Sequence, residues 1–186
     1  MTSVRVRPGD GAVDPLRTRR SITALVALLA SAGCVAASAL TWLSLPDGVG
    51  GSTAISGWGA ISGGSQIAGE NLNDALNGLA TFRPGMLAVV VGGLGLLAAI
   101  GIAAVARGDK RHRVPAAVLA LAGLTGLAWG IVRGLAPDSV QLLGPGENGG
   151  SGTGPWLTAG CSALLLATAV VIFIGRLDPP TRPARR

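Results

Sequence analysis

The sequence is poor in the residues that carry most enzyme chemistry. Its 186 residues include one histidine, no tyrosine and only 13% charged residues, about half the charged share of a typical soluble domain. Its long apolar runs contain no acid, histidine or lysine. Ion pumps usually carry such groups inside the membrane, and hydrolases need a base, a metal or paired carboxylates. We therefore expect no catalytic, metal-binding or cofactor-binding site.

The two cysteines are too few for a disulfide framework. Cys34 lies in the middle of one apolar run, whereas Cys161 lies nearer the outer end of another. The different depths predicted for the two thiols argue against a bond between them. We interpret both as small packing residues.

In place of charge, the sequence has four long apolar runs. They cover residues 22–45, 85–106, 114–135 and 155–176. A helix of about 20 residues crosses a hydrocarbon core of about 30 Å, and only helices satisfy their own backbone groups there. We predict an all-α membrane protein in which four transmembrane helices form a bundle.

The placement of basic residues predicts how the chain is oriented. Thirteen of the 15 precede the first run, separate the second from the third or follow the fourth, and only Arg83 and Arg133 lie on the other side. The positive-inside rule then puts both termini in the cytoplasm. Since arginine greatly outnumbers lysine, the composition resembles that of a high-GC bacterium. We expect a multi-pass protein of the bacterial cytoplasmic membrane and no nucleic-acid partner.

The segments on the cytoplasmic side are short and basic. Residues 1–20 and 178–186 are polar and contain proline, so we predict that both are disordered. Between the second and third spans, a tight hairpin carries four basic side chains that should contact anionic inner-leaflet lipids. These are Arg107, Lys110, Arg111 and Arg113.

The first span has an alternative interpretation as a cleaved signal peptide. Three arginines precede it, and Ala37–Ala39 resembles a cleavage site. However, the apolar stretch is longer than the usual signal core of about 7–15 residues, and it ends in Trp42, which is typical of an interface anchor. We therefore predict an uncleaved helix.

Two outer loops are predicted, at residues 46–84 and 136–154. The first part of the longer loop is rich in glycine and serine around Trp58, which indicates irregular structure. Residues 67–80 place three leucines on one helical face and predict a short amphipathic helix, with an irregular loop as the alternative. The three are Leu72, Leu76 and Leu79.

The third span carries the clearest packing motif. Small residues that recur at every fourth position let helix backbones approach closely in lipid. They predict a packing interface within the chain, with a homo-oligomer or a membrane protein partner as the alternative. The residues are Ala122, Gly126, Gly130 and Gly134.

Two residues on the outer side are candidate contacts for a partner or a lipid. Trp58 stands between two glycines outside any span, where it either enters the membrane interface or contacts a ligand. Arg133 is close enough to the end of its span for the side chain to extend to the headgroups. It either rests there or binds an anionic group.

The overall plan has features of a known family. Trp42 closes the first run, Asn71–Leu76 precedes the second, and Arg107–Arg113 form the basic hairpin. This plan resembles the small four-span tryptophan-associated (tryptophan-operon-associated) membrane proteins of high-GC bacteria, although the outer loop here is longer and richer in glycine. The resemblance implies a membrane location and no particular activity. Claudin-like proteins share the topology, but their Gly-Leu-Trp motif and cysteine pair are missing.

We expect a non-enzymatic membrane protein that acts by association of its helices or outer loop with partner proteins or lipids. The first alternative is a small transporter or channel component for a neutral or lipidic substrate. Its polar cavity would be lined by Ser31, Ser38, Thr125 and Ser162. The second alternative is an outer-face enzyme, in which Arg133 would meet Asp47, Glu70 or Asp74.

Overall fold

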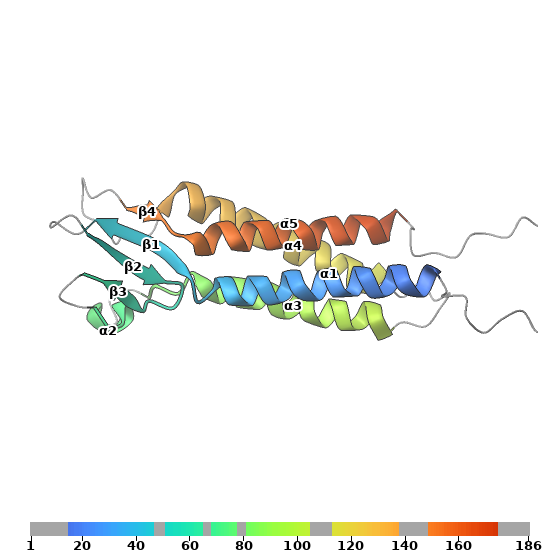
Figure 1. The fold of residues 1–186 in the computed structure, drawn as a ribbon, viewed down its shortest axis with the longest axis horizontal. Coiled ribbons are helices and arrows are strands. Elements are labelled where there is room, and N and C mark those ends of the chain that lie inside the picture. Colours follow the sequence, from blue (N-terminus) through green and yellow to red (C-terminus); the bar gives the residue numbers. More distant parts are fainter. Residues whose placement is uncertain are drawn as a thin grey trace, which may run out of the picture.

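The computed structural model describes residues 15–46, 51–64, 68–77, 81–104, 113–137 and 149–174. Figure 1 shows the long helices running along one axis, with the strands at one end, which we call the sheet end. In chain order the elements are α1 (Pro15–Ala37), β1 (Thr41–Pro46), β2 (Ser52–Ser56), β3 (Ile61–Gly63), α2 (Leu72–Ala75), α3 (Gly85–Ala104), α4 (Arg113–Leu135), β4 (Gly150–Ser151) and α5 (Thr153–Phe173).

Several predictions concern residues outside this described part. They include the disorder predicted for residues 1–14 and for the tail 178–186. They also include three of the four basic residues of the hairpin, which are Arg107, Lys110 and Arg111. The fourth, Arg113, is exposed at the start of α4.

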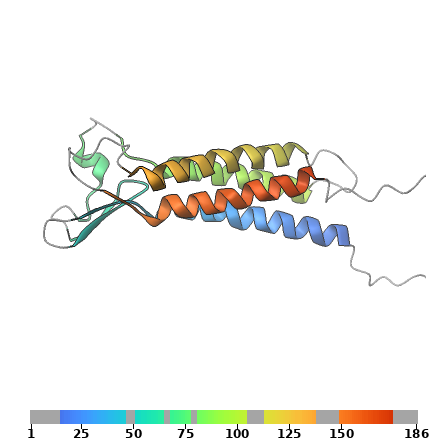
Figure 2. The ribbon, with the colours of Figure 1, turned by 90° about the horizontal axis from the view of Figure 1, so that it is seen from above.

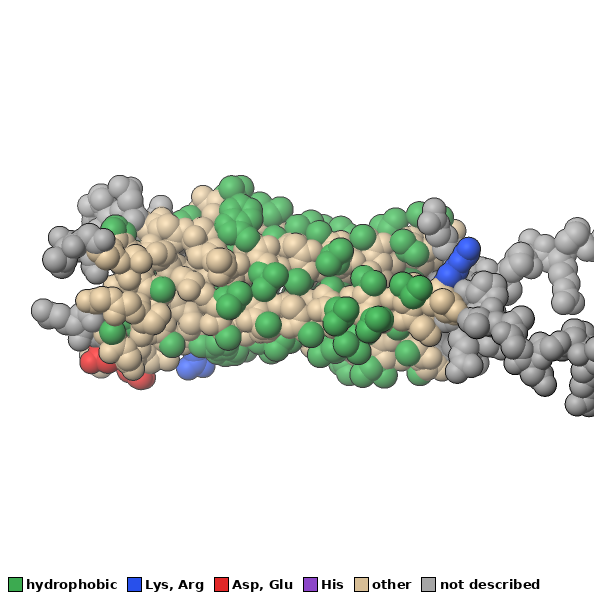
Figure 3. All heavy atoms as spheres, viewed as in Figure 1, with side chains coloured by type: hydrophobic (Ala, Val, Ile, Leu, Met, Phe, Trp, Pro, Cys, Tyr) green, Lys and Arg blue, Asp and Glu red, His purple; other side chains and the backbone are tan. Residues whose placement is uncertain are grey.

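Four helices, α1, α3, α4 and α5, are long and apolar enough to cross a membrane. Their candidate spans are 20 to 23 residues long, with mean hydropathies between 1.7 and 2.5. On the face shown in Figure 3, apolar side chains are spread along the helices, and acidic side chains appear at the sheet end. Such a distribution suits a chain whose middle is surrounded by hydrocarbon.

The first helix differs from the predicted span 22–45. It begins at Pro15, where the fixed φ of proline suits a first helical position, so residues 15–20 are helical and not disordered. It ends at Ala37 because side chains take over its last carbonyl groups. Ser38 Oγ donates to Val35 O at 2.7 Å, and Trp42 Nε1 donates to Ala37 O at 2.9 Å.

The prediction of an all-α chain is wrong, because the residues after α1 form part of an antiparallel sheet. Its strand order is β3-β2-β1-β4. Leu43 pairs with Ile55, which pairs with Ile61, and all three are buried. This apolar row explains why the segment expected to be an irregular loop is ordered. The hydropathy of β1 does not distinguish a buried strand from the end of a helix.

Of the amphipathic helix predicted over residues 67–80, the described residues 68–77 contain the short helix α2. Asn71 caps it, since its side chain accepts a hydrogen bond from the backbone N–H of Asn73. The chain turns away after the helix at Asn77, whose φ of +46° belongs to the left-handed region. Asparagine tolerates that conformation better than most residues. The turn at Asn77 therefore makes the helix shorter than the spacing of the leucines predicts.

The four long helices lie side by side along one axis (Figure 2). They pack most extensively as the pairs α4/α5 and α1/α3. The predicted small residues of α4 lie against α5. A Cβ atom added at Gly130 would lie 2.9 Å from Ala159 Cβ, and one at Gly134 would lie 2.9 Å from the Trp156 ring. Gly126 lies against Ser162, and Ala122 is buried.

A second seam of close contacts, which the sequence analysis missed, joins α3 to α1. A Cβ atom added at Gly92 would lie 2.7 Å from Ser31 O, and Gly95 lies against the Ser31 side chain. The glycines of α3 do not recur at every fourth position, so no motif in the sequence marks this contact. The same physical cause operates in both seams, because a missing side chain brings two backbones together.

We predict that Gly126→Ile lowers the free energy of unfolding by at least about 2 kcal/mol, because the added side chain would displace Ser162 and Val91. Gly130→Ile should behave in the same way. The matched control is Gly160→Ile on α5, since no heavy atom lies within 4 Å of a Cβ added there. Thermal unfolding in nanodiscs measures the difference, and equal stability of Gly126→Ile and Gly160→Ile would contradict the prediction.

Candidate functional site

Three backbone segments meet at Gly57, where the sheet joins the helices. The N–H of Gly57 donates to Leu40 O at 3.2 Å, just after α1, and its carbonyl accepts from Gly85 N at 3.0 Å, at the start of α3. A Cβ atom at Gly57 would lie 2.7 Å from Trp42 Nε1 and 2.9 Å from Gly85 Cα. The site therefore has no room for a side chain, and the sheet is attached rigidly to two helices.

The side chain of Asn73 connects the remaining parts of the sheet end. Its Oδ1 accepts from Phe82 N at 2.7 Å, and its Nδ2 lies 3.1 Å from Trp58 O and 3.2 Å from Phe82 O. In the predicted helix over residues 67–80 only the leucines were singled out, so the sequence did not identify Asn73. The Asn71-Leu72-Asn73 spacing signals only the local cap, in which Asn71 accepts from Asn73 N. It does not indicate the contacts of the Asn73 side chain with Trp58 and Phe82.

Trp58 lies beside the end of α1 and is 40% exposed. Its Nε1 donates to Ser38 Oγ at 3.2 Å, and its carbonyl accepts from Asn71 Nδ2 at 3.3 Å. One edge of the indole is thus tied to the helix while the rest is accessible. This geometry is compatible with both predicted roles, an interface anchor and a contact for a ligand.

Beneath the sheet lies a small apolar core. Its buried members are Trp42, Leu43, Ile55, Phe82 and Ala88, against which Trp129 packs. These residues come from β1, β2, the approach to α3, α3 itself and α4. The core therefore connects the sheet with the helices and fixes the walls of the crevice described next.

Arg133 lies at the edge of this core. Its guanidinium carbon stands 4.5 Å from the centroid of the Trp129 ring, a cation–π arrangement. Trp129 is held in turn, since its Nε1 donates to Pro84 O at 3.1 Å. Arg133 lines a crevice of about 10 Å³ together with Trp42, Leu43, Phe82, Pro84 and Pro137.

The crevice admits about one water-sized group, so a larger ligand would lie at its mouth. A guanidinium offers planar N–H groups that form charge-assisted hydrogen bonds with a negatively charged oxygen. The arrangement thus suits the binding of a single oxyanion.

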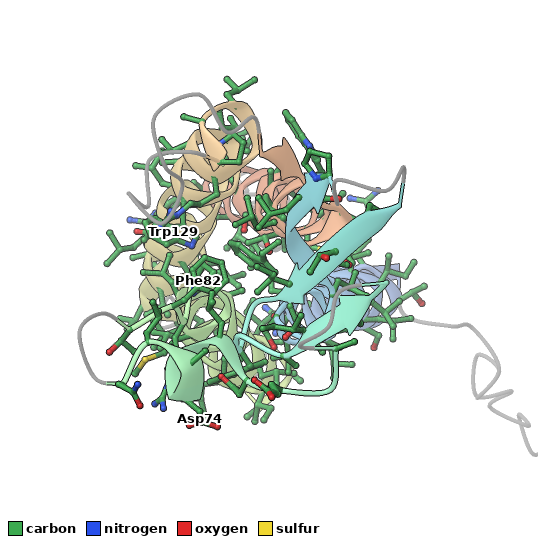
Figure 4. All side chains as sticks on the ribbon, turned by 90° about the vertical axis from the view of Figure 1, so that its left-hand side faces the viewer. Asp74, Phe82 and Trp129 are labelled. Atoms are coloured by element: carbon green, nitrogen blue, oxygen red, sulfur yellow. The ribbon has the colours of Figure 1, made fainter. Side chains whose placement is uncertain are left out.

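Of the acids predicted to meet Arg133 in an enzyme, Asp74 does not lie beside it. In Figure 4, Asp74 and Trp129, on which Arg133 stacks, lie on opposite sides of Phe82. Glu70 and Asp74 are both exposed, and Asp47 lies outside the described residues. Within the described part of the chain, no three His, Cys, Asp or Glu residues form a group that could hold a metal ion.

The polar residues expected to line a transport cavity are distributed differently. Ser31 and Ser162 are fully buried between helices, and Ser38 is buried at the end of α1. Ser31 Oγ donates to Ala27 O of its own helix at 2.7 Å. Thr125, by contrast, is exposed on α4. One continuous cavity lined by these four hydroxyl groups is therefore not formed.

The two cysteines lie at the contact between α1 and α5, where both are buried and neither forms a disulfide. Cys34 Sγ is 3.7 Å from Ser162 Oγ, and Cys161 Sγ would be 2.5 Å from a Cβ atom at Gly33. Since Gly33 adjoins Cys34 in the chain, the two thiols lie at closer depths than the sequence analysis expected. Both act as packing residues in this arrangement.

In comparisons with protein-family models, curated proteins and solved structures, nothing matches the chain. The resemblance to tryptophan-associated membrane proteins stays a prediction.

We predict that Asn73→Asp loosens the sheet end. A carboxylate still accepts from Phe82 N, but it has no N–H to donate to Trp58 O or Phe82 O. Trp58 O keeps Asn71 Nδ2 as a donor, whereas Phe82 O loses its hydrogen bond from residue 73, and a carbonyl left without a donor costs about 1–3 kcal/mol. Amide hydrogen exchange between residues 57 and 82 should accelerate by at least roughly tenfold. Asp74→Asn, one position along the chain, is the control, and equal exchange in both variants would show that the prediction is wrong.

Proposed function

We propose that this chain is a multi-pass protein of a bacterial cytoplasmic membrane, folded as a four-helix bundle with both termini in the cytoplasm. It acts without catalysis, by association of its sheet end with an anionic lipid or protein group at the outer face. The observation that carries this proposal is the guanidinium of Arg133, held over Trp129 at the mouth of the crevice.

The position of Arg133 supports a phosphate or carboxylate ligand. It lies in the last turn of α4, at the level where a spanning helix meets the headgroups. Aromatic contact orients the planar guanidinium, whose parallel N–H groups match phosphate and carboxylate oxygens. Apolar walls reduce screening, so the attraction is stronger than for an exposed arginine. On the opposite side, the basic hairpin with Arg113 would hold anionic inner-leaflet lipids.

Association through the glycine face of α4 is less well supported. That face already lies against Ser162, Ala159 and Trp156 of α5, so a second helix would have to displace α5. Transport of a neutral substrate receives little support either, because Thr125 is exposed on α4, whereas Ser162 is buried. The sheet end is the part of the described chain that projects beyond the apolar helices (Figure 1).

We predict that Arg133→Gln lowers the ratio of phosphatidylglycerol to phosphatidylcholine bound by the protein by roughly tenfold. This is the effect of losing one charge-assisted hydrogen bond. Arg133→Lys should retain part of the preference, since lysine keeps the charge but not the planar fork. Native mass spectrometry of the full chain from mixed nanodiscs measures bound lipid.

The control for this experiment is Arg83→Gln, which removes the other arginine of the sheet end, an exposed one. Both variants leave the cytoplasmic hairpin intact, so inner-leaflet lipid contributes equally to each. If Arg133→Gln and Arg83→Gln retain the same lipid preference, the anionic site at Arg133 is excluded.

The proposed orientation has its own test, in a chain whose native cysteines are replaced by alanine. On intact cells, a membrane-impermeant maleimide should label Ser62→Cys at the sheet end and should not label Ala184→Cys in the C-terminal tail. Permeabilised cells provide the control, since both sites should react there. The reverse labelling pattern would invert the topology.

A further inference from the structure

A second concavity at the sheet end has an uncharged lining with several hydroxyl groups, unlike the Arg133 crevice. It is an open groove of about 500 Å³, within the usual volume range of small-molecule sites. The groove lies between the outward face of the sheet and the start of α5. It is lined by Thr41, Ser44, Ala54, Ser151, Thr153 and Trp156.

The shape of the groove follows from the junction between β4 and α5. Gly152 N donates to Trp42 O at 3.3 Å, and a Cβ atom at Gly152 would collide with the carbonyl of Thr41. Ser44 pairs with Gly150 on one side and with Ala54 on the other. Small residues of the sheet thus form the base of the groove, and the first turn of α5 forms one of its sides.

The groove offers hydroxyl groups that the protein itself does not use. Within the described residues, the side chains of Thr41, Ser44 and Thr153 make no hydrogen bond to the protein. Ser151 is different, since its Oγ donates to Gly152 O at 3.3 Å. None of the lining residues is charged. The unused hydroxyl groups are available as both donors and acceptors.

Trp156 provides the apolar part of the groove. Its ring packs over Gly134 of α4, yet the residue is 48% exposed. The contact with α4 holds the indole in place, so a flat ligand could stack on it at a small entropic cost. An interface anchor alone would explain the indole. It would not explain three unused hydroxyl groups gathered in the same groove.

This combination excludes most classes of ligand. An anion would find no cation in the lining, and an acyl chain would leave the hydroxyl groups unpaired. A peptide strand would find the backbone groups of β1 already bonded to β2 and β4. A sugar ring suits the groove, since it carries many hydroxyl groups and one apolar C–H face. We propose that the groove binds a neutral saccharide, with a ring stacked on Trp156 and hydrogen bonds to Thr41, Ser44 and Thr153.

The saccharide has two possible sources. Trp156 stands in the first turn of α5, at the level of the membrane interface. A glycolipid headgroup in the outer leaflet and a soluble oligosaccharide both reach that level. Their shared chemistry is a neutral sugar ring, and the experiment separates the two.

The test uses the full chain in phosphatidylcholine nanodiscs, because maltoside detergents would themselves compete for the groove. An array of neutral oligosaccharides provides the soluble arm, and nanodiscs with and without diglucosyl diacylglycerol provide the lipid arm. We expect binding in at least one arm, accompanied by a change in tryptophan emission. Trp156→Ala should weaken it by roughly tenfold, the effect of losing aromatic stacking.

Ala54→Phe keeps the test decisive if Trp156→Ala fails to fold. It fills the groove from β2 and does not alter the contact between Trp156 and α4, so it should abolish saccharide binding. Trp58→Phe changes the other exposed tryptophan of the sheet end and should leave binding intact. Absence of binding in both arms overturns the proposal. So does binding that Ala54→Phe does not change, or binding of acidic glycans alone.

The inference is separable from the proposed function. Arg133 does not line the groove, and Trp156 does not line the Arg133 crevice. Arg133→Gln should therefore leave saccharide binding unchanged, and Ala54→Phe should leave the lipid preference unchanged. Loss of both activities in either variant would contradict the assignment of two separate sites.

Discussion

The close approach of three backbone segments at Gly57 is the contact on which the sheet end depends. Hydrogen bonds from this residue tie the segment after α1 and the start of α3 to the end of β2. Any side chain there would collide with Ser38, Trp42 or Gly85. Because the sheet is held so closely, Trp42 and Phe82 form a common core with the helices. That core in turn sets the walls around Arg133.

The same principle organises the long helices. Glycines on α4 admit the backbone of α5, and glycines on α3 admit the backbone of α1. In hydrocarbon there is no hydrophobic drive for helix association, so van der Waals contact at short range has to replace it. Serine and threonine side chains inside this packing bond to carbonyls of their own helix, as Ser31 and Thr158 do. The apolar residues left over face outward.

The sheet end contains two separate concavities with different lining residues. One crevice presents a cation among aromatic walls, and one groove presents hydroxyl groups beside an exposed indole. Arg133 was identifiable from the sequence, because an ionisable residue near the end of an apolar run is conspicuous. The groove was not, since Thr41, Ser44 and Thr153 are ordinary residues that come together only when β4 pairs with β1. Asn73 was missed for the same reason, because its partners Trp58 and Phe82 are distant in the chain.

Hydropathy alone determined the four long apolar helices, because a run of about 20 uncharged residues has few other ways to satisfy its backbone in lipid. Their small residues also indicated where backbones approach closely, at Gly126 and Gly130. Only the tertiary structure decided that α1 stops at Ala37 and that β1 follows, since a buried strand and a helix end have the same apolar composition. It also decided which helix the Gly126 face meets, and that the Gly/Ser-rich loop forms a sheet. Pairing between distant segments has no signature in a local pattern, because the apolar residues of each strand order it only once the partner strand lies beside it.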